Sequence, residues 1–143
     1  MSQRNYDRFF RWLKKQNYKI INASVFNDIA GVLGKNLLLD SRDKLIKGSF
    51  EKPFVIKVED WIPVGCYGSI REYASRLKAG GFSLVLVVQS IGSSLKAAFG
   101  DNVLCFDLSE VYTKIVVHHS YGKETKYLFG EKVREFLRGK ETT

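Results

Sequence analysis

Cysteine is scarce in this 143-residue chain, and its two cysteines, Cys66 and Cys105, are far apart. Cysteines so few and so distant cannot build a disulfide framework or a zinc knuckle, and we expect core or free thiols in a reducing compartment. The chain also lacks an apolar run of the roughly 18 residues that a membrane span needs. Its first residues, MSQRNYDR, contain no apolar segment of the kind found in signal peptides. The sequence therefore predicts a cytoplasmic protein without membrane insertion.

Several catalytic signatures are missing as well. The chain contains no glycine-rich phosphate loop of the GxxxxGKS/T type, no serine nucleophile elbow, no zinc-ligand spacing and no dinucleotide fingerprint. A nucleoside triphosphate is held mainly by the backbone amides of such a loop, together with a lysine. We therefore expect no ATP hydrolysis, no cofactor and no metal ligands. His118 and His119 do not change this expectation, because neighbouring residues of a strand point to opposite faces.

Basic residues outnumber acidic ones by 23 to 15, which leaves a net charge of +8. Such a surplus attracts polyanions, so nucleic acid is the first partner to consider and anionic lipid the second. A basic protein with no such partner is the alternative. The predicted first helix concentrates the charge, and its candidate nucleic-acid-binding residues are Arg8, Arg11, Lys14 and Lys15. Aromatic residues between them could stack on bases, although their helical spacing favours positions in the core.

The hydrophobic pattern alternates between helical and strand-like periods. Helices are predicted for residues 6–16, 25–33, 40–47, 69–78, 93–99 and 124–138, and strands for residues 18–23, 54–60, 84–88, 103–106 and 114–118. Ser24 is expected to cap the second helix, because serine accepts hydrogen bonds from exposed amides. The alternation predicts an α/β fold in three layers, with a mainly parallel or mixed sheet flanked by helices. We expect one domain, residues 1–138, and a disordered tail, residues 139–143.

Residues 25–42 also allow a hairpin in place of the helices. In this interpretation IAGVL and NLLLD are two strands that turn at Gly34 and Lys35, since Gly31 and Gly34 both weaken a helix. The local sequence does not decide between helix and hairpin. The choice matters for function, because the hairpin would bring Asp28 next to Asp40.

Two apolar segments end in polar residues of a kind found in nucleotide-driven motors. The segment from Phe54 to Asp60 ends in two acids, and a second apolar segment ends in Gln89 and Ser90. Three further motifs follow in order: Phe99-Gly100, the strand that begins Thr113-Lys114-Ile115, and Glu124-Thr125. Together these motifs resemble the C-terminal half of the motor domain of conjugative coupling proteins, the hexameric DNA pumps related to the FtsK and HerA translocases.

The resemblance implies roles for three residues. Glu59 and Asp60 would correspond to the metal-binding and water-activating acids of the motor, and Gln89 to its phosphate sensor. Because the phosphate loop is missing, the resemblance implies a degenerate ATPase fold and a non-catalytic, DNA-associated protein of a virus, plasmid or other mobile element. Lys57 interrupts the first apolar strand, so it must reach an edge of the sheet or pair with an acid. Its replacement by methionine is then expected to be neutral or mildly stabilising.

A second interpretation makes the chain an enzyme. The predicted order of helix, strand, hairpin, strand, helix and strand is similar to the layout of restriction-endonuclease-like nucleases, including archaeal Holliday-junction resolvases. In such enzymes carboxylates hold a divalent metal, here Mg²⁺, and a lysine neutralises developing charge. With a hairpin at Gly34, the candidate catalytic residues are Asp28, Asp40 and Arg42. Arg42 stands where the nuclease pattern has a lysine, so the hypothesis includes an inactive relative. If Lys57 instead lies in a catalytic cluster with Glu59 and Asp40, Lys57→Met is expected to leave folding intact and to abolish Mg²⁺-dependent cleavage.

A protein-interaction module, with a protein partner or as a homo-oligomer, is the third hypothesis. Strand order discriminates between the first two. Parallel pairing of residues 54–58 with residues 84–88 would support the motor ancestry. A hairpin across Gly34 and Lys35 would support the nuclease.

Overall fold

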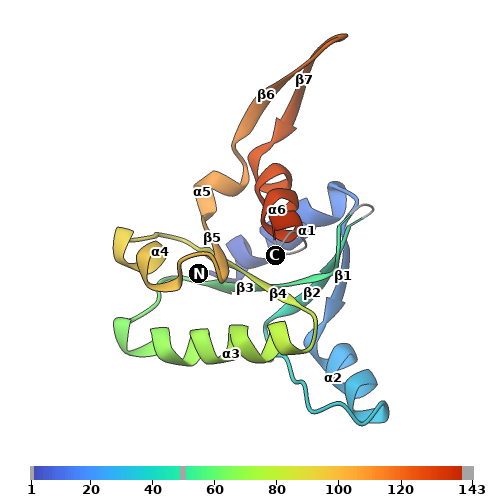
Figure 1. Cartoon of the computed structure of the whole chain (residues 1–143), viewed down its shortest axis with the longest axis vertical. Coiled ribbons are helices and arrows are strands. Elements are labelled where there is room, and N and C mark those ends of the chain that lie inside the picture. The colour runs from blue at the N-terminus through green and yellow to red at the C-terminus, as the bar shows by residue number, and fades with distance from the viewer. Residues whose placement is uncertain (1, 49–50, 140–143) are drawn as a thin grey trace.

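The computed structural model describes residues 2–48 and 51–139 and shows a three-layer α/β domain (Figure 1). A sheet forms the middle layer, and helices lie on both of its faces. The tail predicted to be disordered, residues 139–143, lies outside the described residues except for Gly139, where the last helix ends.

Five strands form the central sheet in the order β1-β2-β3-β4-β5. They are β1 (Lys19–Asn22), β2 (Lys44–Lys47), β3 (Phe54–Glu59), β4 (Ser83–Val88) and β5 (Val103–Asp107). The pairs β1–β2 and β2–β3 are antiparallel, whereas β3–β4 and β4–β5 are parallel. The sheet is therefore mixed, and β3 is its central strand.

Two groups of helices cover the two faces of this sheet. On one face lie α1 (Gln3–Lys15), α5 (Leu108–Val111) and α6 (Leu128–Gly139). On the other lie α2 (Ala23–Val32), α3 (Tyr67–Ala79) and α4 (Ser93–Phe99), and a short 3-10 turn, η1 (Val64–Cys66), leads into α3. Each group encloses its own hydrophobic core against the sheet.

Strand β3 shows why the chain adopts this arrangement. Its residues from Phe54 to Val58 are all buried, which is typical of a strand covered by helices on both faces. Phe54, Ile56 and Val58 belong to the core under α1 and α6, whereas Val55 belongs to the core under α3. Because side chains alternate along a strand, Lys57 points to the same face as Val55.

Most predicted elements are confirmed, but residues 40–47 and 124–127 are not helical. The first segment contains β2, whose Leu45 pairs with Val55 across the antiparallel ladder and is buried there. The second belongs to strand β7 (Gly122–Tyr127), so the closing helix begins only at Leu128. Ser24 does not cap the second helix, because Asn22 holds the cap position.

The hairpin across Gly34 and Lys35 is also wrong. Residues 23–32 form α2, and residues 35–40 have no regular secondary structure. Gly34 has a φ of 69°, a left-handed conformation that glycine adopts at the ends of helices. The helical interpretation of residues 25–33 is therefore confirmed.

A second, two-stranded sheet projects from the body of the molecule (Figure 1). It consists of β6 (Lys114–His119) and β7, paired antiparallel, and we call it the β6–β7 hairpin. Its two ends meet at the base, where the backbone N–H of Leu128 donates to the carbonyl of Thr113 at 2.8 Å. Trp12 of α1 packs edge-on against Tyr127, with ring centroids 5.0 Å apart, and so anchors this base.

No helix in the described part of the chain is long and apolar enough to cross a membrane. Both cysteines are free thiols; Cys66 is exposed and Cys105 is buried. Burial raises the pKa of Cys105 to about 11, so this thiol stays protonated. The expectation of core or free thiols is confirmed.

Candidate functional site

Ionisable side chains gather at the end of the sheet where β2 begins and β3 ends. Asp40 and Asp43 come from the turn before β2, and Lys57 and Glu59 come from the second half of β3. Because the two strands are antiparallel, the start of one lies beside the end of the other. Residues 57 and 59 share the face of the sheet that α3 covers. We call these four residues, with Tyr73 of α3, the acid–lysine cluster.

Lys57 is the centre of the acid–lysine cluster. Its Nζ donates hydrogen bonds to Oδ2 of Asp40 at 2.8 Å and to Oδ1 of Asp43 at 3.2 Å, and it lies 4.0 Å from Oε1 of Glu59. The hydroxyl of Tyr73 donates to Oδ2 of Asp43 at 2.7 Å and accepts from the backbone N–H of Asp40 at 3.2 Å. Tyr73 therefore ties α3 to both aspartates.

The acid–lysine cluster has a buried half and an exposed half. Lys57 is 7% exposed and Asp43 only 2%, whereas Asp40 and Glu59 are exposed. Lys57 is expected either to reach an edge of the sheet or to pair with an acid, and in the structure it pairs with acids. This changes the expectation for Lys57→Met, because removal of the lysine would leave the buried carboxylate of Asp43 uncompensated.

Burial and charge pairing set the ionisation of the cluster. Burial raises the pKa of Asp43 above its ordinary 3.8, by more than Lys57 and Tyr73 lower it. Burial also opposes the charge of Lys57, but the attraction of Asp43 and the hydrogen bonds to both aspartates outweigh it, so the pKa of Lys57 is raised. Burial and the neighbouring carboxylate of Asp43 raise the pKa of Tyr73, which keeps its phenol a proton donor.

A cavity of about 230 Å³ opens beside the exposed half of the cluster. Asp40, Lys57, Glu59 and Tyr73 line one side of it, and Trp61 and Ile62 help to form the rest. Trp61 is 66% exposed, whereas Ile62 is buried. The cavity therefore combines carboxylates, one ammonium and an exposed aromatic ring.

The ammonium of Lys57 lies between the carboxylates, at the point where they would hold a cation. Within residues 2–48 and 51–139, no group of three or more His, Cys, Asp or Glu side chains is arranged to hold a metal ion. A divalent cation would have to displace the ammonium from both aspartates. The residues present therefore do not fit a metal alongside Lys57.

The residues of the motor interpretation lie at the same end of the sheet. Glu59 ends β3, Asp60 follows it, and Gln89 follows the parallel neighbour β4. The backbone N–H of Gln89 donates to the carbonyl of Glu59 at 3.1 Å. All three side chains are exposed, and that of Glu59 faces Lys57. Strands β3 and β4 thus pair in parallel, as the motor interpretation expects, but β1–β2 and β2–β3 are antiparallel.

The residues of the nuclease interpretation are not gathered around one centre. Asp40 belongs to the acid–lysine cluster, but Arg42 is exposed and its guanidinium carbon lies 4.4 Å from the centre of an aromatic ring of α1. Asp28 is exposed on α2. Its neighbour Asn27 contacts the loop before β2 instead: its side-chain amide donates to the carbonyl of Leu39 at 3.0 Å and accepts from the N–H of Leu39 at 2.8 Å.

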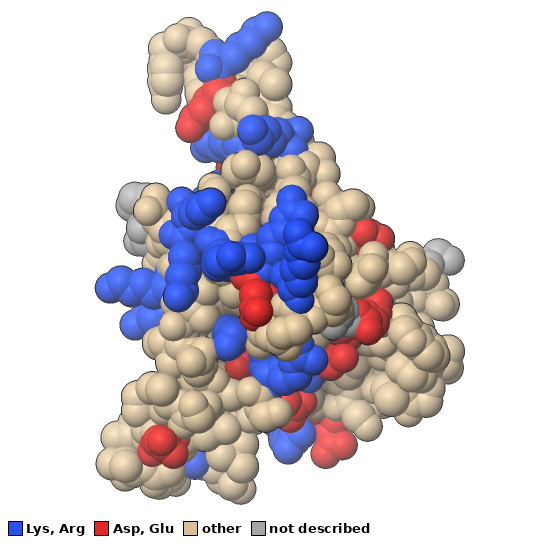
Figure 2. Space-filling model, turned by 180° about the vertical axis from the view of Figure 1, so that it is seen from behind, with Lys and Arg blue, Asp and Glu red and all other residues tan. Residues whose placement is uncertain are grey.

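Exposed cations form a row along α1, which we call the basic stripe. Its members recur at the spacing of one helical face and are Arg4, Arg8, Arg11 and Lys15. Lys14 is exposed as well, whereas Phe9 and Leu13 are 0% exposed. The aromatic residues of this helix therefore serve mainly the core, as their spacing predicts. Seen from behind, Lys and Arg side chains gather in the middle of the molecule and continue onto the projecting hairpin (Figure 2).

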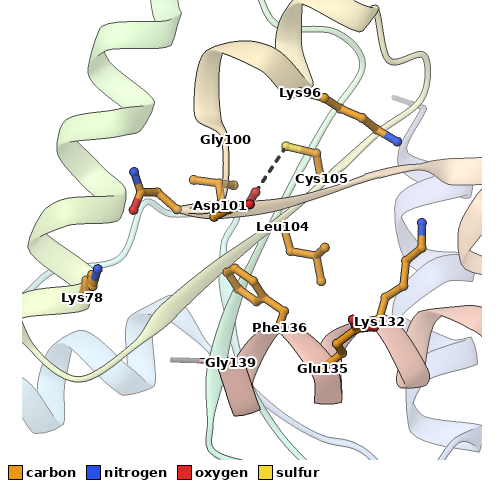
Figure 3. Close-up of a pocket in the computed structure, with 12 residues that line it drawn as sticks. Lys78, Lys96, Gly100, Asp101, Leu104, Cys105, Lys132, Glu135, Phe136 and Gly139 are labelled. Atoms are coloured by element: carbon orange, nitrogen blue, oxygen red, sulfur yellow. Dashed lines mark hydrogen bonds between the residues drawn. The ribbon is translucent and has the colours of Figure 1, made fainter. Parts of the chain in front are cut away.

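A larger hollow of about 670 Å³ lies along β5 (Figure 3). Three of its lining cations come from three different helices and are Lys78, Lys96 and Lys132. Two of them already pair with Glu110, at 3.4 Å from Lys96 and 3.2 Å from Lys132. Figure 3 shows Lys78 on α3 at the left of the view, apart from Lys96 and Lys132 at the right. The cations do not converge on one point, and we assign no ligand to this hollow.

Sequence reasoning misses Asp43 and Tyr73. The helical spacing of residues 69–78 correctly places Tyr73 against the core, but spacing does not reveal what a hydroxyl contacts. Asp43 falls in the segment that is wrongly predicted as helix. The available signal is Lys57 itself, because a lysine inside an apolar strand must reach an edge of the sheet or pair with an acid.

Comparison with known proteins gives no relative: no family description, no curated protein and no solved structure matches the chain significantly.

Proposed function

We propose that this protein binds nucleic acid, DNA before RNA, without catalysis, and that the basic stripe of α1 is a main contact. The stripe is the observation that carries the proposal. Its cations are exposed on one side of a helix whose other side is fixed in the core by Phe9 and Leu13. Cations held on a rigid helix can neutralise successive phosphates and release their condensed counterions. The net charge of +8 acts in the same direction.

The acid–lysine cluster supports a structural role rather than catalysis. Its ammonium is already satisfied by two aspartates, and its buried half joins β2, β3 and α3. Separating such a buried pair is costly, because one buried charge is then left uncompensated. The cluster therefore ties the turn before β2 to β3 and α3 at this end of the sheet.

A binding series against salt concentration tests the proposal. Fluorescence anisotropy of labelled duplex DNA should show an affinity that falls steeply with salt. The variant Arg8→Glu, Arg11→Glu, Lys15→Glu should reduce the affinity at low salt by about 100-fold or more, since three phosphate contacts are reversed.

A matched variant separates local contact from net charge. Lys35, Arg71 and Lys78 are exposed, and the last two lie on α3, across the sheet from α1. Their replacement by glutamate changes the net charge by the same amount and should weaken binding far less. Equal losses from both triple variants would show that α1 is not the contact. Failure of the wild-type protein to bind DNA or RNA at low salt would refute the proposal.

One observation favours a second candidate, a metal-dependent nuclease. Asp40, Asp43 and Glu59 converge on a lysine, and Asp40, Glu59 and this lysine line a cavity. Cleavage of branched or duplex DNA that depends on Mg²⁺ or Mn²⁺ and is lost in Glu59→Gln would establish it. Because Lys57 fills the cation position, we expect no cleavage.

A protein contact is proposed at α2, with a second copy of the chain as the partner. Residues at the spacing of one helical face, Val25, Ile29 and Val32, are 49%, 55% and 87% exposed, and Leu33 next to them is 63% exposed. An exposed apolar stripe of this kind is a common feature of interfaces. Sedimentation should show association that rises with concentration and is lost in Ile29→Glu; a monomer at every concentration would refute this contact.

The two free thiols also favour a reducing compartment, and we propose a cytoplasmic location. Cell fractionation with an antibody to the protein would test it.

A further inference from the structure

The β6–β7 hairpin has two unlike faces. Cross-strand pairs alternate between them, because successive residues of a strand point in opposite directions. The outer face carries the pairs Lys114/Tyr127, Val116/Thr125 and His118/Lys123. The inner face carries the pairs Ile115/Lys126, Val117/Glu124 and His119/Gly122. All outer-face residues except the half-buried Tyr127 are exposed.

The charged side chains of the inner face form ion pairs within the protein. Oε2 of Glu124 lies 3.0 Å from Nε2 of His119 and 3.8 Å from Nζ of Lys126, which is also 3.6 Å from Oε1 of Glu131 in α6. The ring of His119 stacks on that of Tyr121 at the tip, with centroids 5.1 Å apart. These contacts hold the hairpin in one shape.

The outer face presents cations and methyl groups but no carboxylate. Lys114 and Lys123 stand near its two ends. Between them, Val116 is 55% exposed and lies directly opposite Thr125. Cations attract phosphates, threonine can bond to base edges, and methyl groups pack against the methyl group of thymine. The combination complements a groove of a nucleic-acid duplex better than it complements a lipid surface, because the apolar part is only one side chain wide.

The dimensions of the hairpin select the kind of duplex. Each strand has six residues, so the ribbon is about 20 Å long. The major groove of B-form DNA is about 12 Å wide and about 8.5 Å deep and admits a two-stranded ribbon. The major groove of A-form RNA is too narrow for side chains to read.

We propose that the outer face of the β6–β7 hairpin enters the major groove of duplex DNA while the basic stripe contacts the adjacent backbone. This inference rests on the proposed nucleic-acid binding and narrows its ligand to B-form duplex DNA. One view of the surface shows Lys and Arg side chains both on the body and on the hairpin (Figure 2). Trp12 couples the two contacts, since it belongs to α1 and packs against Tyr127 at the hairpin base.

Two lysines of β7 provide a matched test. Lys123 lies on the outer face and Lys126 on the inner face, so Lys123→Gln and Lys126→Gln remove the same charge from opposite sides of the ribbon. Anisotropy titrations should use duplex DNA and duplex RNA of the same sequence over a range of salt concentrations. Lys123→Gln should lower the salt dependence for DNA by about one phosphate contact and leave RNA binding unchanged. Lys126→Gln should change neither.

Two further variants test the groove contact directly. Val116→Glu places a carboxylate on the outer face and should reduce DNA affinity by about tenfold, in the range of a lost base contact. In the second variant Gly-Gly replaces residues 114–127, which is feasible because Thr113 and Leu128 already meet. This shortened protein should still bind through the basic stripe, but its preference for DNA over RNA should disappear. Circular dichroism checks that both variants fold.

The outcomes separate this inference from the proposed function. If the wild-type protein binds neither duplex, both are refuted. If it binds DNA and RNA equally, or if Lys123→Gln and Lys126→Gln weaken DNA binding equally, only the hairpin inference is refuted, and contact through the basic stripe stands. Loss of DNA preference in the shortened protein together with unequal effects of the two lysines would establish it.

Discussion

Strands β3 and β6 have the same length and opposite surroundings. Each has six residues, but five consecutive residues of β3 are buried while exposed and half-buried residues alternate along β6. Both contain lysine. Lys57 of β3 is compensated by the protein's own aspartates, whereas Lys114 at the start of β6 is exposed on the outer face of the hairpin. The comparison shows that the same residue type is buried among the protein's own acids in one strand and is exposed in the other, where its ammonium lies 5.4 Å from the centre of the Tyr127 ring.

The largest difference in stability should come from replacing a lysine in each of the two regions. Lys57→Met should lower the free energy of unfolding by about 3–5 kcal/mol, because it leaves the Asp43 carboxylate buried without its cation. Lys123→Met on the hairpin should change it by no more than about 0.5 kcal/mol. Urea unfolding followed by fluorescence measures both. The double variant Lys57→Met, Asp43→Asn should recover part of the loss; a purely additive double variant would show that the two residues are not coupled.

The next comparison is between the stability effects of removing two tyrosine hydroxyls. Tyr73→Phe should destabilise the protein by about 1–3 kcal/mol, since the hydroxyl bonded to Asp43 and Asp40 is lost from a buried site. Tyr121→Phe at the hairpin tip, where the residue is 88% exposed, should have no measurable effect. Thermal melts suffice to compare them. Equal melting temperatures for the two variants would mean that the Tyr73 hydroxyl contributes nothing to the cluster.

The pH dependence of stability should reveal the buried carboxyl. Because burial raises the pKa of Asp43 above 3.8, the folded protein binds this proton more tightly than the unfolded chain does. The stability contributed by Asp43 is therefore fully present below about pH 3.8 and is lost as pH rises through the folded-state pKa. Relative to Asp43→Asn, the wild-type protein should lose stability from about pH 4 upward, by less than about 1.4 kcal/mol per pH unit. A relative gain over this range would mean that Lys57, rather than burial, dominates the ionisation of Asp43.

The smallest effects on stability should come from removing one methylene group, by Ile→Val, in each strand. Ile56→Val in the core of β3 should cost about 0.5–1.5 kcal/mol, because Ile56 is 0% exposed and a cavity remains. Ile115→Val on the half-buried inner face of the hairpin should cost less. Denaturant midpoints at unchanged slope give both values. The opposite order would show that the hairpin is packed more tightly than its position suggests.

The same contrast explains how much of the fold the sequence predicts. Residues 84–88 are a continuous apolar run and residues 54–58 are apolar except for Lys57, and such runs identify buried strands without knowledge of the rest of the chain. β7 reads GKETKY, a polar sequence that gives no strand signal. It becomes a strand because β6 precedes it across a short turn into Gly122, whose φ of 144° favours glycine.

The candidate site is less predictable for a related reason. Asp40, Glu59 and the basic residues of α1 can be selected from the sequence, because charged residues at the ends of strands or on one face of a helix stand out. Asp43 cannot be selected, because its importance depends on contacts with Lys57 and Tyr73, which are distant in the sequence. The antiparallel pairing of β2 and β3 brings Asp43 to Lys57, and the packing of α3 on the same face of the sheet brings Tyr73 to Asp43.

Asn27 should protect one amide of the loop before β2 from hydrogen exchange. Its side-chain amide bonds to both the N–H and the carbonyl of Leu39, as the backbone of a neighbouring strand would. In a deuterium-exchange experiment, most amides of residues 35–38 should exchange quickly, because this stretch has no regular structure. The amide of Leu39 should instead exchange slowly, as if it belonged to a sheet. A local opening of this loop that separates Asp40 from Lys57 would thus also break the two hydrogen bonds between Asn27 and Leu39. The exchange rate of the Leu39 amide would then measure how often the loop opens.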